Sequence, residues 1–405
     1  MKSIISLLLC CGALGAGALP AAAAGLPRAK PAQVGLSAEK LDAIAPLAQE
    51  LADKKKTAGA VVLVARNGKV AYLEAFGKMD LASGKAMRTD AIFRIASMTK
   101  PVTSAAALIL ADDGRINLDD PVSKYVPSVK DLRVSSAGAS VAPDREITVR
   151  DLMRQSSGID YPDYDTSSGS LADWAAKLAG RPLLFQPGTR FNYSWDADLL
   201  ARVIEVASGK PLNEFFSERI FKPLGMKDTG FYVPKNKAAR FAVTYAAGKD
   251  GRLVPDPSRD KLLLGEPGYF SGSGGLVSTA QDYLRFCQML LNGGELQGRR
   301  LLRAETVRRM MTNQLPPEAL PMAVNGIKFP QDYGYGLGTG VWMSKTPDTD
   351  PKEGEISWTG GASTYFWAAP KPQLVVIVMQ QLVPIDISLM KVHPLALAAL
   401  QDGKN

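Results

Sequence analysis

Strand patterns near both ends of the chain, with helical patterns between them, constrain its fold most. Residues 58–77 form two apolar stretches around Asn67-Gly68, a dipeptide that favours the tight turn of a β-hairpin. Apolar, β-branched and aromatic stretches predict further strands near the other end, at 355–359, 363–369 and 373–381. A short Pro-Lys-Pro turn joins the last two. We therefore expect one antiparallel sheet that both ends of the chain build together.

Helical patterns occupy much of the remaining sequence. We expect helices at 37–56, 97–113, 171–180, 196–208 and 386–401, and a glycine turn leading into a helix within 272–291. The fold class that follows is α/β of the α+β type, an antiparallel sheet flanked by helices with a large helical insertion. The α/β lobe would comprise about residues 30–95 and 335–405, and the mostly helical lobe about residues 96–334, within one domain at 25–405.

Residues 1–24 have the pattern of an export signal. Lys2 precedes an apolar core from Ile4 to Leu19, and small residues with an A-x-A site follow at Ala22–Ala24. We expect this segment to be removed and the mature protein to be periplasmic or secreted. The mature part keeps only Cys287, which leaves no pair for a disulfide within the chain. No later segment has the roughly 18 uninterrupted apolar residues that a membrane span needs.

The positive charge of the chain is not concentrated. The formal net charge is +8 at pH 7, but no run of five or six like charges occurs. Nucleic-acid recognition has no support beyond this net charge, and we expect no nucleic-acid partner.

The residue inventory excludes several routes to hydrolysis. The single histidine, His393, lies far in sequence from any candidate nucleophile, which argues against a Ser-His-Asp triad. No G-x-S-x-G nucleophile elbow occurs, and one His with one mature Cys supplies zinc ligands poorly. We expect no metal and no cofactor. Hydrolysis, if present, must use serine with lysine or tyrosine.

Ser97 and Lys100 form a candidate catalytic pair. They lie three residues apart at the start of an apolar helix, where positions i and i+3 share one face. A lysine amine kept from water there is costly as an ammonium, and as a neutral amine it can activate a neighbouring serine. The alternative is a helix N-cap with a solvated lysine. The same spacing at Ser37 and Ser388 is explained by a helix cap and by the polar start of the last helix.

Three motifs resemble the superfamily of serine β-lactamases, penicillin-binding proteins and family VIII carboxylesterases. "SMTK" (97–100) is similar to its first motif, "FNYSW" (191–195) to its second, and "WTGG" (358–361) takes the place of the third, K-T-G or H-x-G. The segments "PGTRFNYS", "FKPLGMKDTGF", "GGLVSTAQDYLRF" and "YGYGLG" also match its common pattern. Order and spacing agree over nearly the whole mature chain, with the W-x-G-G form most like the family VIII esterases.

The resemblance implies a role for each motif residue. Ser97 would attack a carbonyl and become acylated, while the positive charge of Lys100 would favour tyrosinate at Tyr193. Tyr193 would take the serine proton and pass it to the leaving group. The backbone amides of Ser97 and Gly361 would form the oxyanion hole. The alternative for Tyr193 is an interior tyrosine with a satisfied hydroxyl.

Two departures from the β-lactamase pattern bear on the substrate. Trp195 stands where Y-x-N has its asparagine, and Trp358 stands where K-T-G has its lysine. A site that lacks both groups should favour neutral, apolar acyl compounds, although Trp358 has an alternative role in strand packing. We expect Trp358, Gly360 and Trp195 to bind substrate; further candidates for an acyl pocket are Tyr161, Tyr164 and Phe191.

The resemblance thus implies a secreted serine esterase that cleaves esters of short acyl chains through an acyl-serine intermediate. A β-lactamase or D-Ala-D-Ala peptidase is the first alternative, with a lactam or peptide as the small-molecule substrate. A non-catalytic cell-wall binding protein or sensor is the second. Retention of Ser97, Lys100 and Tyr193 together argues against the latter, because a binder needs no proton network.

Overall fold

The computed structural model describes residues 25–401 apart from 137, 161–168, 249–250, 325 and 348. The expected export signal at 1–24, and Tyr161 and Tyr164 among the expected pocket residues, lie outside the described residues. No described helix is long and apolar enough to cross a membrane.

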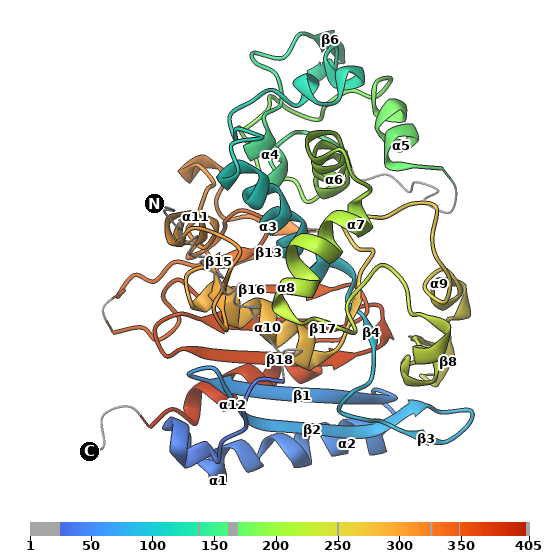
Figure 1. Ribbon diagram of the computed structural model, residues 1–405, viewed down its shortest axis with the longest axis vertical. Coiled ribbons are helices and arrows are strands. Elements are labelled where there is room, and N and C mark those ends of the chain that lie inside the picture. Colours follow the sequence, from blue (N-terminus) through green and yellow to red (C-terminus); the bar gives the residue numbers. More distant parts are fainter. Residues whose placement is uncertain are drawn as a thin grey trace, which may run out of the picture.

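An antiparallel sheet built from both ends of the chain forms the centre of the molecule (Figure 1). Among the described residues it has eight strands, in the order β14 (Tyr333–Tyr335), β15 (Gly340–Trp342), β16 (Ile356–Gly360), β17 (Thr364–Ala369), β18 (Leu374–Gln380), β1 (Gly59–Arg66), β2 (Lys69–Asp80) and β3 (Lys85–Ala86). The C-terminal strand β18 pairs with the N-terminal strand β1 from Gln380 opposite Ala60 to Leu374 opposite Arg66. The sequence prediction of one sheet from two termini is therefore confirmed.

Helices cover both faces of this sheet. Their bounds are α1 Ala38–Asp42, α2 Ile44–Asp53, α3 Thr99–Asp112, α4 Val149–Met153, α5 Leu171–Leu178, α6 Asp196–Ser208, α7 Leu212–Phe216, α8 Lys222–Leu224, α9 Pro257–Lys261, α10 Ala280–Leu291, α11 Ala304–Met310 and α12 Val392–Ala398. Figure 1 shows α1, α2 and α12 on one side of the sheet and the lobe with α3 to α7 on the other. The insertion between the two sheet halves is thus mostly helical, as the sequence predicts.

Both faces of β1 are buried, which explains why its sequence reads as a continuous apolar run. Val61 and Leu63 pack in the core shared with α3 and α10, whereas Val62 and Val64 pack in the core shared with α1, α2 and α12. Asn67 and Gly68 both have positive φ, 51° and 73°, as the predicted tight hairpin turn requires.

Two predicted helices are shorter than their sequence patterns. The first, expected over 37–56, is broken at Ala43 into α1 and α2 and ends at Asp53. The last, expected over 386–401, is a 3₁₀ turn at Ser388–Lys391 followed by α12. The chain leaves α12 because Leu400 forms an isolated bridge with Leu36, and the Gln401 N–H donates to the Gly35 carbonyl. Pairing with the N-terminal segment thus replaces the final helical turn.

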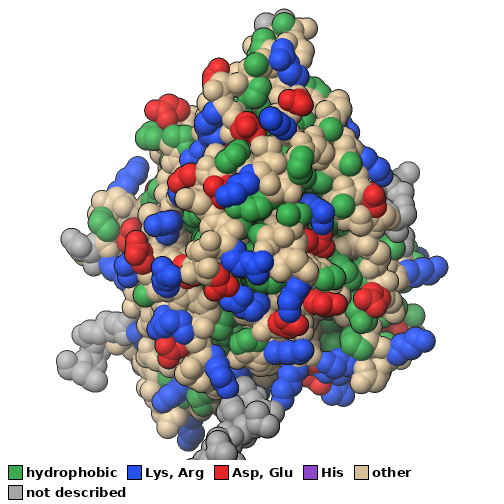
Figure 2. Space-filling view, turned by 45° about the horizontal axis from the view of Figure 1, so that its top comes forward, with side chains coloured by type: hydrophobic (Ala, Val, Ile, Leu, Met, Phe, Trp, Pro, Cys, Tyr) green, Lys and Arg blue, Asp and Glu red, His purple; other side chains and the backbone are tan. Residues whose placement is uncertain are grey.

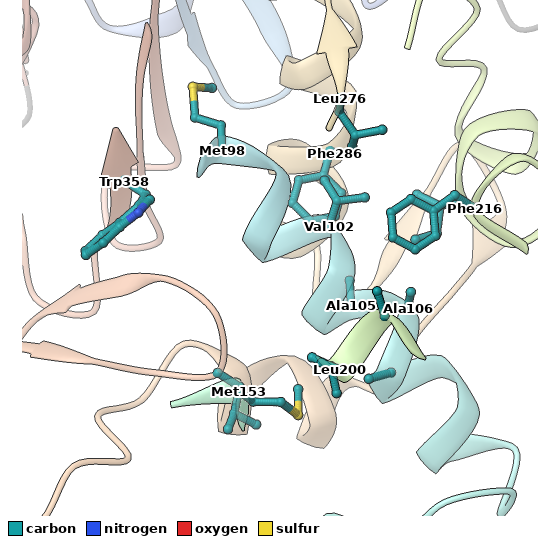
Figure 3. Close-up of a cluster of buried hydrophobic side chains, with 14 of the residues drawn as sticks. Met98, Val102, Ala105, Ala106, Met153, Leu200, Phe216, Leu276, Phe286 and Trp358 are labelled. Atoms are coloured by element: carbon teal, nitrogen blue, oxygen red, sulfur yellow. The ribbon is translucent and has the colours of Figure 1, made fainter. Parts of the chain in front are cut away.

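Helix α3 lies in the interior, between the sheet and α6. All of its residues from Thr99 to Leu110 are buried, and Gly114, with φ 72°, ends it as predicted. Figure 3 shows Met98, Val102, Ala105 and Ala106 following one another along this helix, with Trp358 on a strand beside its start. The buried helix therefore brings its first turn to the junction of sheet and lobe.

Charged side chains are spread over the face seen in Figure 2, where Lys and Arg alternate with Asp and Glu. Exposed ion pairs of the protein include Arg88 with Asp90 and Arg300 with Glu295. The surface in this view matches the dispersed charge of the sequence.

Candidate active site

Ser97 lies on a tight backbone turn between the short strand β4 (Phe93–Arg94) and α3. Ala96, just before it, has φ 43°, a left-handed conformation that costs a non-glycine residue of order 1–2 kcal/mol. The flanking residue Ile95 is fixed from both sides, because its N–H donates to the Leu276 carbonyl (3.0 Å) and its carbonyl accepts from the Met98 N–H (3.0 Å). The turn directs the half-buried Ser97 toward the cleft between the lobes.

Lys100 is buried, 1% exposed, one turn into α3. Its Nζ donates to Ser97 Oγ at 3.4 Å and to the Ser273 carbonyl at 3.0 Å. Behind it, the Ser273 N–H donates to Asp198 Oδ1 at 3.3 Å. Burial raises the pKa of Asp198, although hydrogen bonds from serine and the charge of Lys100 act in the opposite direction. The backbone N–H and carbonyl of Ser273 therefore link the buried carboxyl to the buried amine.

The segment with Gly272, Gly274 and Gly275 does more than turn the chain. A Cβ on Gly272 would come within 2.4 Å of the Ala197 carbonyl oxygen, so only glycine allows this approach to α6. The Gly272 carbonyl in turn accepts from Thr103 Oγ1 at 2.7 Å. The sequence prediction of a simple turn missed that the segment packs between α3 and α6 and supplies the carbonyl that binds Lys100.

Tyr193 lies over the amine on the other side. Lys100 Nζ is 4.4 Å from the centroid of the Tyr193 ring. The indole N–H of Trp358 donates to the Tyr193 hydroxyl at 3.2 Å, with the two ring centroids 5.4 Å apart. The structure thus brings Ser97, Lys100 and Tyr193 together from two distant segments, and it gives the Trp358 N–H a partner within the cluster.

Two further tyrosines lie beside this cluster but differ in environment. Burial raises the pKa of both Tyr333 and Tyr335, and Tyr335 is fully buried with its ring edge on Trp358. The Tyr333 hydroxyl is bound to Ser357 Oγ at 2.7 Å. Neither is in cation–π contact with a lysine among the described residues, whereas the Tyr193 ring has the Lys100 amine over its face.

Gly360 and Gly361, at the end of β16, face the serine turn. A Cβ on Gly360 would lie 2.4 Å from the Ile95 carbonyl oxygen and 2.1 Å from Thr364 Oγ1, whereas one on Gly361 would come no closer than 4.0 Å, to Ala96 Cβ. Gly360 therefore allows β16 to pack closely against the backbone of the serine turn at Ile95. That Gly360 also binds substrate stays a prediction. Gly361 lines the same cavities as Ser97, and the family resemblance implies that its N–H is the second oxyanion donor.

Replacing Gly360 by alanine should destabilise the protein by about 1–3 kcal/mol, because the added methyl group meets backbone that cannot move freely. Thermal unfolding measures this loss. Gly361→Ala is the matched control: the added Cβ meets only ordinary contact distances there, and its melting temperature should stay near that of the wild type. Equal losses in the two variants would contradict this assignment of the close contact.

Two cavities meet at Ser97 and Gly361. One, of about 620 Å³, is lined mainly by aromatic and aliphatic side chains and includes Tyr193 and Trp358. The other, of about 640 Å³, includes Lys100 and Trp195 and is bounded by residues 261–275. Of the predicted substrate-binding residues, Trp358 and Trp195 thus line different cavities. Phe191 packs on Tyr335 with ring centroids 5.2 Å apart.

His393 is a residue of the site that sequence reasoning missed. On α12 it lines the same cavity as Ser97, although the two are almost 300 residues apart in the chain. Its Nε2 is 2.8 Å from Glu355 Oε2, and its ring stacks on Trp367 with centroids 4.8 Å apart. The signal available in the sequence was only its uniqueness, because nothing in the sequence shows that α12 reaches Glu355, beside the start of β16.

Asp196, three residues after Tyr193, is a second buried carboxyl behind the site. Its Oδ1 accepts from Ser157 Oγ at 2.5 Å and from Ser194 Oγ at 2.8 Å. Burial nevertheless raises its pKa from 3.8 to about 7. Since the folded chain binds this proton more tightly than the unfolded chain, the contribution of Asp196 to stability falls as pH rises between these two values.

Asp196→Asn should therefore weaken the loss of stability with rising pH. We expect a smaller drop in melting temperature between about pH 4 and pH 7 than in the wild type, measured by thermal unfolding across this window. Asp173→Asn is the control, because hydrogen bonds from Ser170 lower the pKa of Asp173 and move its contribution to more acid pH. Parallel curves for Asp196→Asn and the wild type would contradict the assigned titration.

An antiparallel sheet, a helical lobe and a serine, a lysine and a tyrosine gathered at their junction define a serine hydrolase of the β-lactamase and transpeptidase type. The Beta-lactamase family matches residues 44–388, and the chain belongs to this family.

Named relatives include esterases. "Esterase EstB" of Burkholderia gladioli is 34% identical over 278 residues, covering 61% of this chain and 68% of that protein. "Lovastatin esterase" of Penicillium rubens is 30% identical over 382 residues, covering 84% of this chain and 93% of that protein. Among solved structures, "EstCE1, a hydrolase with promiscuous acyltransferase activity" aligns with a TM-score of 0.76 and 25% identity, over 90% of this chain and 99% of its own.

Proposed function

We propose that this chain is a secreted or periplasmic esterase that cleaves carboxylic esters of short acyl chains through an acyl intermediate on Ser97. The observation that carries this proposal is Trp358. At the position where the K-T-G motif has a cation, the chain has an indole that is 6% exposed and donates its N–H to Tyr193. An anionic substrate finds no ammonium there, whereas a neutral ester loses nothing. The esterase names of two relatives support the same reading.

The geometry suits acyl transfer step by step. Ser97 Oγ attacks the ester carbonyl while Tyr193 takes its proton, and Lys100 stabilises the phenolate across the ring face. The developing oxyanion accepts from the Ser97 and Gly361 N–H groups. Tyr193 then gives the proton to the leaving alcohol oxygen. Water repeats the sequence on the acyl-enzyme and releases the acid.

Parallel assays with an ester and a penicillin test the assignment of ester substrates. The purified protein is offered p-nitrophenyl butyrate and a labelled penicillin in parallel, and turnover and stable labelling are measured. We expect repeated turnover of the ester and weak or no accumulation of the penicillin adduct. Stable penicillin labelling without ester turnover would overturn the proposal in favour of a penicillin-recognising peptidase, and efficient penicillin hydrolysis would favour a β-lactamase.

Export is tested separately. Fractionation of cells that produce the full chain should place the protein outside the cytoplasm, and N-terminal sequencing should find a start close to residue 25. Retention in the cytoplasm with Met1 in place would contradict the expected export signal.

A further inference from the structure

The apolar cavity extends well beyond the reacting serine. Its aromatic wall runs from Tyr193 to Trp358 and then to Phe329. The ring centroids of Trp358 and Phe329 are 6.3 Å apart, and the two ring planes differ by 11°. Phe329 stacks on Tyr333 with ring centroids 5.2 Å apart, and the Tyr333 ring contacts that of Trp342 with centroids 6.4 Å apart. We call this cavity the aromatic groove, with the lining residues Ser97, Tyr193, Val324, Phe329, Pro330, Tyr333, Trp342, Lys352, Glu355, Ser357, Trp358, Thr359, Gly361, Trp367, Ile385, Met390, His393, Pro394 and Leu397. Its volume of about 620 Å³ is far more than a short acyl chain fills.

The far end of the groove is polar. Lys352 Nζ lies 3.4 Å from the centroid of the Trp342 ring, and Glu355, 4% exposed, contacts His393 Nε2. A carboxylate on Nε2 leaves Nδ1 of His393 as the remaining polar atom of that ring. An elongated molecule in the groove therefore meets apolar walls along its length and hydrogen-bonding groups at its end.

Proton transfer decides which arm of an ester enters this groove. Tyr193, the group that returns the proton to the leaving oxygen, lines the aromatic groove, whereas the second cavity includes Lys100 and Trp195 instead. The alcohol oxygen must lie within reach of the Tyr193 hydroxyl when the C–O bond breaks. The alcohol arm is thus directed into the groove, and the acyl arm into the cavity beside Trp195.

We propose that the aromatic groove is the binding site for the alcohol part of the substrate, an elongated aromatic or apolar alcohol that ends in a hydroxyl or carboxyl group near Lys352 and His393. This rests on the proposed esterase function and names its substrate class. In the reaction the Ser97 Oγ–carbonyl carbon bond forms, the carbonyl carbon–alcohol oxygen bond breaks, and that oxygen takes the proton held by Tyr193. The free alcohol then leaves along the groove.

A series of butyrate esters with one acyl group and different alcohols tests this site. The probes are the esters of ethanol, 4-phenylbutanol, 4-(4-hydroxyphenyl)butanol and 4-(4-carboxyphenyl)butanol, with kcat/KM measured by acid release. We expect kcat/KM to rise about tenfold or more from the ethyl to the phenylbutyl ester, as burial of a phenyl group allows. A polar end on the ring should add about two- to tenfold.

Variants assign the preference to the groove. Leu397→Trp and, at an exposed loop position (47%), Ile385→Trp both place bulk in the groove and should lower the phenylbutyl-to-ethyl ratio about tenfold. Because Leu397→Trp and Ile385→Trp lie at different positions, the test still holds if one of the two variants fails to fold. His393→Phe keeps the stack on Trp367 but takes the Nε2 partner from Glu355, so its folding is checked by thermal unfolding; it should lower the gain from the polar ring end. Leu262→Trp, in the second cavity and 52% exposed, should leave the alcohol ratio as in the wild type and change the preference for acyl length.

The outcomes separate this proposal from the proposed function. Absence of turnover with every ester overturns both. Turnover of ethyl butyrate with equal kcat/KM for all alcohols overturns the groove assignment alone. Loss of the alcohol preference in Leu262→Trp but not in the groove variants shows that the two arms are reversed, and it overturns the proposal as well.

Discussion

Ser97→Ala should abolish ester turnover and the covalent intermediate, while the protein stays folded. The substitution removes only the hydroxyl at the tip of the serine turn; the N–H that would bind the oxyanion and the buried contacts of α3 remain. Intact-protein mass spectrometry after quenched reaction with p-nitrophenyl butyrate should show a butyryl adduct on the wild type and none on the variant. Peptide mapping of the wild-type adduct should place it on Ser97.

Ser37→Ala is the matched control for this experiment. Ser37 begins the same S-x-x-K spacing, but its Oγ accepts from the Lys40 N–H at 3.3 Å and caps α1, and Ser37 lines neither of the two cavities. Its loss should cost about 1 kcal/mol of stability and leave turnover intact. An adduct that persists in Ser97→Ala would mean that another residue is the nucleophile, and the proposed function would fall with it.

Ser37 is one of several positions where the sequence alone predicts the local structure correctly. Local signals were sufficient where one short stretch determines its own conformation: Asn67-Gly68 for the hairpin, Ser37 for a helix start and Gly114 for a helix end. They failed where distant segments compete for the same backbone groups. The last helix is shorter than its pattern because Gly35 and Leu36 take up the backbone of residues 400–401.

The residues of the site also fall into those that the sequence predicts and those that only the fold reveals. The motif residues Ser97, Lys100 and Tyr193 were identified from spacing and resemblance, and the structure gathers them. Contacts that depend on three-dimensional approach were missed: the Ser273 carbonyl on Lys100, and His393 in the groove. No periodicity in one segment reports the partner that folding brings to it, so a single sequence does not show these contacts.

Tyr193→Phe should slow ester turnover by about a hundredfold or more and leave the fold intact, because a proton-transfer group contributes on this scale. The variant keeps the ring that faces Lys100 at 4.4 Å and packs on Trp358 at 5.4 Å, so the loss reports the hydroxyl alone. The rate is measured as kcat on p-nitrophenyl butyrate, with thermal unfolding as the check on folding. Near-normal kcat would show that another group takes the serine proton.

Two further phenylalanine variants decide how the hydroxyl is supported. Trp358→Phe keeps an aromatic ring but removes the N–H that donates to the Tyr193 oxygen at 3.2 Å, and it should cost about tenfold in kcat, as loss of one hydrogen bond to a charged oxygen does. Tyr335→Phe removes a buried hydroxyl that has no hydrogen-bond partner among the described residues, and kcat should stay near the wild-type value. The expected order of loss is thus Tyr193, then Trp358, then Tyr335. If Tyr335→Phe lost more than Tyr193→Phe, the base would be the deeper phenol, and the arrangement of Ser97, Lys100 and Tyr193 would have a structural role instead of a catalytic one.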